Sequence, residues 1–148
     1  LEMAEQIKKH AVYSVIAIGN PKYNELYKNF ANLNKLLAWG HAKAIENILE
    51  KNMCEYALSD KFGDESLIKN ALQKRGQTIR LEQMVRAESD IAVAAASVLA
   101  RATFVQKMKQ MELNYGCDFP KGCNSIVKDA ATKFISKHGQ IFKYMLRF

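Results

Sequence analysis

Hydrophobic positions along this chain alternate between helical and strand-like spacing. Apolar residues that recur every three or four positions predict helices, and these segments are residues 1–10, 22–27, 34–49, 64–74, 91–114, 125–137 and 140–148. Apolar or alternating runs predict strands, at residues 11–18, 55–59 and 77–84. Strands separated by helices are typical of an α/β domain, in which ligands bind beyond the carboxyl ends of the strands.

A run of small side chains marks the predicted helix at residues 91–114. The segment that leads into it reads RAESDIAVAAASVLAR, from Arg86 to Arg101. Alanine favours helix strongly, and the lack of bulk lets the helix approach a neighbouring backbone closely. Glu88 lies just before the helix, where the positive end of the helix dipole stabilises an ionised carboxylate. Two interpretations stay open: a carboxylate held near a cation, or an acid that serves only as a good helix cap.

Asp60 is the second acidic candidate, because it follows the predicted strand at residues 55–59. A single predicted strand separates it from Glu88. Mg²⁺ prefers oxygen ligands and takes one or two carboxylates together with phosphate and water. Paired ions of this kind stabilise the attacking and leaving oxygens in phosphodiester cleavage. Two acids alone are few for such a site, and we expect the nearby acids to act as helix caps or first-turn charges, namely Asp64, Glu65 and Asp90.

The composition fits one domain of 148 residues with a formal net charge of +7. Positive charge favours a polyanionic partner, nucleic acid above all, although it also serves plain solubility. The three cysteines are an odd number without metal-type spacing, which favours a reducing cytoplasm. No secretory signal is visible, and no apolar run approaches the roughly 20 residues of a membrane span, so we expect no membrane association.

Other catalytic classes are disfavoured. None of the three histidines has a serine or cysteine partner at a suggestive position, and we expect His41 to pack or cap on its own helix. A Walker-type glycine-rich loop is absent. Arg101 and Lys121 are weak candidates for contacts to a phosphate backbone, and Gly122 would allow a close backbone approach. Such basic residues are more often simply solvated.

Four segments together resemble the type 2 ribonucleases H. Residues 86–101 resemble the signature helix of that family, and glutamate rather than aspartate before the helix is similar to ribonuclease HIII rather than ribonuclease HII. Residues 32–46 (NLNKLLAWGHAKAIE) resemble its helix after the second strand region. Residues 58–62 (LSDKF) resemble its Asp-Gln-Phe segment, with Lys61 in place of the usual glutamine. Residues 119–131 (FPKGCNSIVKDAA) resemble its Pro-x-Gly loop and the following helix.

This resemblance implies an endonuclease that cuts the RNA strand of RNA/DNA hybrids with Mg²⁺ or Mn²⁺. It also implies a ribonuclease H-like mixed sheet flanked by helices. The family uses four acids, of which Asp60 matches the third and Glu88 the fourth. The first two form an Asp-Glu pair on a first strand, and this chain opens at Leu1 within a helical pattern. We therefore expect residues 1–148 to be a partial catalytic domain that lacks that strand and the amino-terminal domain, inactive alone and monomeric when complete.

An alternative from another class is a non-catalytic nucleic-acid-binding module. A basic α/β domain that kept the scaffold and lost the chemistry would also lack the acidic pair. An Asp-Glu pair encoded upstream would favour the enzyme.

Overall fold

The computed structural model describes residues 1–122 and 124–139. Helices dominate it, and their bounds are α1 Glu2–His10, α2 Asn20–Phe30, α3 Leu33–Leu49, α4 Ser66–Ala71, α5 Ile91–Tyr115 and α6 Ser125–His138. The strands are β1 Tyr56–Asp60 and β2 Arg80–Met84, and two short 3₁₀ turns are η1 Gly76–Thr78 and η2 Ala87–Ser89. The alternation of helices and strands expected of an α/β domain is confirmed.

The sheet of the described residues consists of β1 and β2, which pair in parallel. Their register sets Tyr56 opposite Arg80 and Asp60 opposite Met84, so both strands end at the same edge. The connection between them runs through α4, as a parallel pair requires. α3 packs against α4 beside the sheet, around a core that contains Ala38, Ala42, Ile68 and Leu72.

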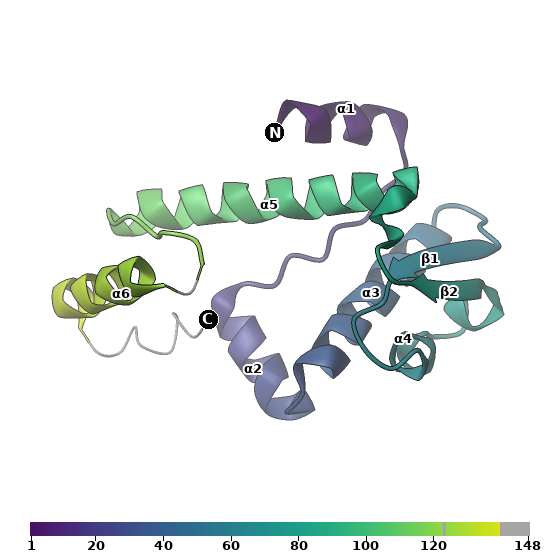
Figure 1. The fold of residues 1–148 in the computed structure, drawn as a ribbon, viewed down its shortest axis with the longest axis horizontal. Helices are drawn as coiled ribbons and strands as arrows, with labels where there is room; N and C mark the ends of the chain where they lie inside the picture. Colours follow the sequence, from purple (N-terminus) through teal and green to yellow (C-terminus); the bar gives the residue numbers. More distant parts are fainter. Residues whose placement is uncertain (123, 140–148) are drawn as a thin grey trace.

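α5 forms a long rod that joins two distant parts of the molecule (Figure 1). The sheet lies at its amino-terminal end and α6 at its carboxyl-terminal end. α1 lies along the first half of α5, where Ala4 packs with Leu99 and Ala102. At the other end Phe119 and Phe134, from the following loop and α6, pack with a methionine of α5.

Three predicted elements differ from the structure. The strand predicted at 77–84 begins only at Arg80, because residues 76–78 form η1. Residues 11–18, predicted as a strand, form an extended segment without strand pairing that connects α1 to α2 (Figure 1). The apolar run is still used, because Val15 packs against the cluster between α1 and α5. The helix predicted at 64–74 is shorter, since α4 ends at Ala71. The helix predicted at 140–148 lies outside the described residues.

α5 corrects the expectation that no apolar segment approaches the length of a membrane span. With 25 residues and an apolar window, it is long and apolar enough to cross a bilayer by length and composition. A single helix of this kind is weak evidence of a membrane span; 17% of its apolar window is buried, and α5 contacts α1, η2 and β1.

Candidate active site

Asp60 ends β1 at the carboxyl edge of the sheet and is exposed. Its Oδ1 accepts a hydrogen bond of 3.3 Å from the backbone N–H of Ala87. Ala87 is fully buried and opens η2, the turn that holds Glu88. The structure therefore brings the two elements that carry the predicted carboxylates into direct contact.

A tight turn separates the end of β2 from α5. Arg86 adopts the left-handed conformation, with φ 58° and ψ 44°, which is uncommon for a residue other than glycine. The N–H of Asp90 then donates to the carbonyl of Ala87 at 2.9 Å. This turn places the exposed side chain of Glu88 on the segment held against Asp60.

Asp90, rather than Glu88, caps α5. Its Oδ1 accepts hydrogen bonds from the N–H groups of Ala92 and Val93, at 2.8 and 3.2 Å, the usual role of an N-cap aspartate. The expectation that Asp90 is a cap is confirmed. The N-cap hydrogen bonds therefore come from Asp90, and Glu88 lies before it, in η2.

The other nearby acids have structural partners. Asp64 Oδ1 accepts from the N–H and the hydroxyl of Ser66, at 2.8 and 2.6 Å, and these hydrogen bonds lower the pKa of Asp64. Glu65 Oε1 lies 2.8 Å from the Nζ of Lys61, and the hydrogen bond to Glu65 raises the pKa of Lys61. As expected, both acids belong to the start of α4 rather than to the carboxylate pair.

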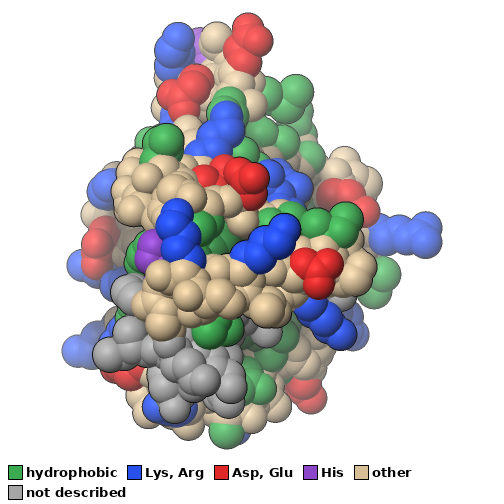
Figure 2. All heavy atoms as spheres, turned by 90° about the vertical axis from the view of Figure 1, so that its left-hand side faces the viewer, with side chains coloured by type: hydrophobic (Ala, Val, Ile, Leu, Met, Phe, Trp, Pro, Cys, Tyr) green, Lys and Arg blue, Asp and Glu red, His purple; other side chains and the backbone are tan. Residues whose placement is uncertain are grey.

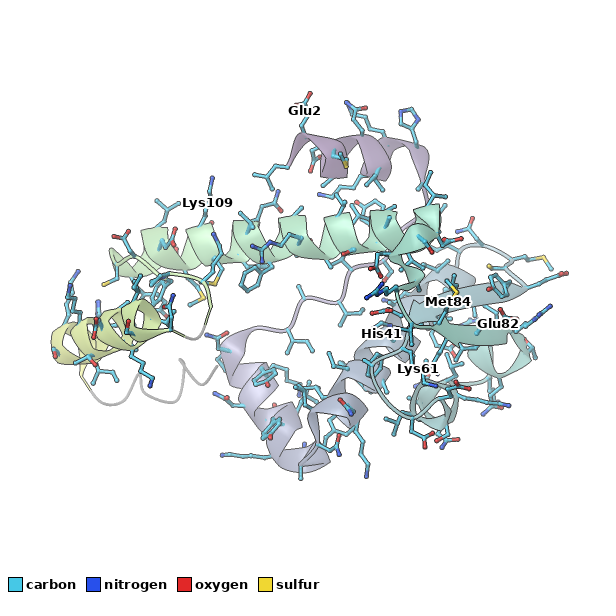
Figure 3. All side chains as sticks on the ribbon, in the orientation of Figure 1. Glu2, His41, Lys61, Glu82, Met84 and Lys109 are labelled. Carbon is cyan, nitrogen blue, oxygen red and sulfur yellow. The ribbon has the colours of Figure 1, made fainter. Side chains whose placement is uncertain are left out.

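The sequence did not predict the contact between His41 and Ser59, which lies next to Asp60. Ser59 is buried, its hydroxyl donates to the carbonyl of Asp60 at 3.0 Å, and its Oγ lies 3.3 Å from Nδ1 of His41. The His41 ring lies 5.0 Å from that of Phe62. Desolvation by these neighbours lowers the pKa of His41, and the charge of Asp60 opposes the shift. Figure 3 shows His41 and Lys61 at this same end of the sheet.

One signal in the sequence could have revealed that His41 faces the strands. It lies three residues after Ala38 and one before Ala42, both of which are buried against the sheet. Helical periodicity alone thus predicts that His41 borders the face that meets the strands. The expectation that His41 packs is confirmed, but its contacts reach β1 rather than staying on its own helix.

Metal ligands are sparse in the described part of the chain. Among residues 1–122 and 124–139, no group of three or more histidine, cysteine, aspartate or glutamate side chains gathers as a metal site. The donors that the predicted site offers are therefore two carboxylates, those of Asp60 and Glu88. Oxygen donors of this type suit Mg²⁺ or Mn²⁺.

Comparison with protein-family models shows the family of the chain. The model of the family described as Ribonuclease HII matches residues 1–147. The chain belongs to the ribonuclease HII family. Within this family it is 40% identical over 139 residues to Ribonuclease HIII of Protochlamydia amoebophila (94% of this chain, 46% of the relative). It is 43% identical over 140 residues to Ribonuclease HIII of Chlamydia pneumoniae, covering 93% of this chain and 47% of that relative.

Solved ribonuclease HIII structures share the fold. The crystal structure of Bst-RNase HIII in complex with Mn²⁺ matches with a TM-score of 0.87 and 26% identity, over 97% of this chain and 49% of that one. Aquifex aeolicus RNase H3 matches with a TM-score of 0.61 and 31% identity, over 78% of this chain and 42% of that one. The chain spans about half the length of the curated relatives it matches. The predicted ribonuclease H-like fold is confirmed, with a small parallel sheet in the described residues.

The basic candidates lie away from the two carboxylates of this ribonuclease HII family member. Arg101 is exposed on α5, with its guanidinium 5.4 Å from the ring centroid of Phe104. Lys121 and Gly122 lie in the loop after the far end of α5, which turns back along the helix because Phe119 packs on Met108. Gly122 has φ +112° and open space where a side chain would lie. Figure 2 shows that end of the molecule, where basic and acidic side chains are interspersed.

Proposed function

We propose that this chain carries part of the active site of an endoribonuclease that hydrolyses the RNA strand of RNA/DNA hybrids. One observation carries the proposal most directly: Asp60 at the strand end is hydrogen-bonded to the turn that holds Glu88. The family match and the likeness to a Mn²⁺-bound ribonuclease HIII support it. A monomer in the cytoplasm is part of the same proposal.

Asp60 and Glu88 are the residues that would hold divalent cations. Both offer carboxylate oxygens, the donor type that Mg²⁺ and Mn²⁺ prefer, and the hydrogen bond from Ala87 engages only Oδ1 of Asp60. When bound, such ions supply Lewis-acid activation of water and stabilisation of charge on the scissile phosphate. No third acid, histidine or cysteine joins this pair among the described residues, in line with a site to which an upstream Asp-Glu pair would contribute.

Hydrogen bonds hold the backbone that carries both carboxylates. β1 presents Asp60 at the sheet edge, and Ser59 ties its backbone to the interior. Asp90 caps α5, so the segment around Glu88 is anchored on both sides. Arg101, Lys121 and Gly122 remain candidates for contacts to the phosphate backbone, and the 2′-hydroxyl of the RNA would distinguish RNA from DNA.

Cleavage of a labelled RNA/DNA hybrid, with Mg²⁺ and then with Mn²⁺, tests the proposal. The assay compares this chain with the same chain extended upstream by its native sequence. We expect cutting by the extended protein, abolished by Asp60→Asn and by Glu88→Gln. Asp90→Asn is the matched control, because asparagine caps a helix as well as aspartate; it should keep the activity.

The binding-module alternative predicts a different outcome. If the extended protein binds the hybrid in a salt-sensitive manner but does not cut it with either ion, the enzyme proposal is wrong. Strong metal-dependent cutting by this chain alone would contradict the expectation that the chain holds only part of the active site. Loss of cutting in Asp90→Asn with full activity in Glu88→Gln would reassign the roles of the two acids.

A further inference from the structure

A cysteine, a lysine and a histidine meet where α6 docks against the end of α5. The Sγ of Cys117 lies 3.8 Å from the Nζ of Lys137 and 3.7 Å from Nε2 of His138. Lys137 also donates to the carbonyl of Gly116 at 3.1 Å, which holds its ammonium beside the sulfur. This cluster lies beyond the opposite end of α5 from Asp60 and Glu88, so the proposed hybrid cleavage does not use it.

The sulfur is reachable from solvent. Cys117 is half-buried and lines two adjoining open hollows, of about 830 and 530 Å³, which admit small reagents. Glu112 and Asp118 line the same hollows and oppose a negative charge on the sulfur. The carboxylate of Glu112, however, already accepts a hydrogen bond from the N–H of Phe119 at 3.3 Å.

Cationic donors beside a thiol favour the thiolate, which is the nucleophilic form. Cys54 provides a comparison within the same chain. It is exposed, and its thiol donates to the carbonyl of Tyr56 at 3.0 Å, much as the thiol of Cys117 donates to the carbonyl of Tyr115 at 3.4 Å. Accessibility therefore favours Cys54, whereas the ammonium of Lys137 beside the sulfur favours Cys117.

We propose that Cys117 is a modification site, a nucleophilic thiol that hydroperoxides oxidise to the sulfenic acid. The sulfur attacks one peroxide oxygen, an S–O bond forms and the O–O bond breaks, and the second oxygen leaves as hydroxide or alkoxide that takes a proton from water. Sulfur loses two electrons and the peroxide gains them. Lys137 and His138 are placed to donate hydrogen bonds to the product oxygen.

Rates of alkylation by iodoacetamide at pH 7 test the thiol reactivity at each position. Trypsin separates the three cysteines of the chain into residues 52–61, 110–121 and 122–128, so mass spectrometry reads each rate independently. We expect Cys117 to react about fivefold faster than Cys54, because the ammonium of Lys137 lies beside its sulfur and Cys54 has no such neighbour among its described contacts. In urea, with the fold confirmed lost by circular dichroism, the two rates should converge.

Variants identify the cause. Lys137→Met should slow Cys117 severalfold and leave Cys54 unchanged. Lys133→Met is the matched control, because Lys133 lies on the same helix and lines the same hollow. Trapping with a sulfenic-acid-reactive 1,3-dione after addition of hydrogen peroxide should label residues 110–121 first. Equal rates for Cys117 and Cys54 in the folded chain, no response to Lys137→Met, or no dione adduct on Cys117 would each overturn the proposal.

Discussion

Gly76→Ala should destabilise the chain because the structure leaves no room for a methyl group there. A Cβ at Gly76 would lie 2.5 Å from Cδ2 of Leu72 and 2.6 Å from Oε1 of Glu46. Both neighbours are buried, at 5% exposure each. The same Glu46 oxygen accepts hydrogen bonds from the N–H groups of Gln73 and Gly76, at 2.7 and 2.8 Å. The methyl group must therefore displace either a packed leucine or a doubly bonded carboxylate.

The expected loss follows from these two costs. Overpacking a core costs about 1–3 kcal/mol, and weakening a buried hydrogen bond to a charged acceptor costs about 1–2 kcal/mol. Replacing glycine with alanine stabilises the fold by about 0.5–1 kcal/mol, because it lowers the conformational entropy of the unfolded chain. The free energy of unfolding should therefore fall by about 1–4.5 kcal/mol, which lowers the urea midpoint by about 0.5–2 M.

Urea unfolding followed by circular dichroism measures this change. Gly40→Ala is the matched control, because Gly40 lies within α3 and nothing lies within 4 Å of its added Cβ. That variant should gain about 0.5–1 kcal/mol. In a double-mutant cycle, Leu72→Ala should relieve part of the Gly76→Ala loss. If Gly76→Ala unfolds at or above the parent midpoint while Gly40→Ala gains stability, the close packing argued here is refuted.

Three further predictions use the same unfolding assay. Asp90→Ala should lose about 1 kcal/mol by removing the cap of α5, whereas an unchanged midpoint would show that the cap contributes nothing. Ala31→Gly should gain about 0.5–1 kcal/mol, because Ala31 ends α2 with φ 49°, where glycine avoids steric cost; a loss would contradict that geometry. The lowered pKa of His41 means that the unfolded chain binds its proton more tightly. Stability should therefore fall as pH drops from about 7 through the usual histidine pKa near 6.5, and less steeply in His41→Asn; equal slopes would exclude this contribution.

The contact that makes Gly76 tight also explains an error in the sequence prediction. Apolar spacing predicted a helix over residues 64–74, but α4 ends at Ala71. Glu46, which comes from α3, takes the N–H groups of Gln73 and Gly76 and so holds a turn where the helix would have continued. Local periodicity carries no information about an acceptor that lies 27 and 30 residues away.

Residues 11–18 show that strand pairing is harder to predict than extended conformation. Their composition predicted a strand, and the segment is extended, yet β1 and β2 alone pair in the described chain. A strand is defined by a hydrogen-bonded neighbour, which no property of the segment itself supplies. The helix of small residues, in contrast, was predictable almost to its ends, because its signal is local: alanine-rich sequence after a capping Asp90.

Asp60 and Glu88 stay a prediction of the sequence, and the hydrogen bonds around them required the structure. The sequence placed Asp60 at the end of a strand and Glu88 before a helix one strand later, and Asp60 accepts a hydrogen bond from the turn that holds Glu88. Sequence left open whether Glu88 was only a helix-end charge; the structure gives the N-cap hydrogen bonds to Asp90, and the role of Glu88 stays a prediction. The Ser59–His41 contact joins residues from separate elements, and its detection required the packing of α3 on β1.

α5 fixes the scale on which this molecule can read a ligand. Its length is about 37 Å, but the loop after it turns back, because Phe119 packs on Met108 within the helix. Lys121 therefore lies closer to the carboxylates than the full length of α5, at a separation that a continuous helix keeps constant. Under the proposed function, hybrids too short to bridge that separation should bind more weakly. Affinity should level off at a length below one turn of B-form DNA, about 34–36 Å.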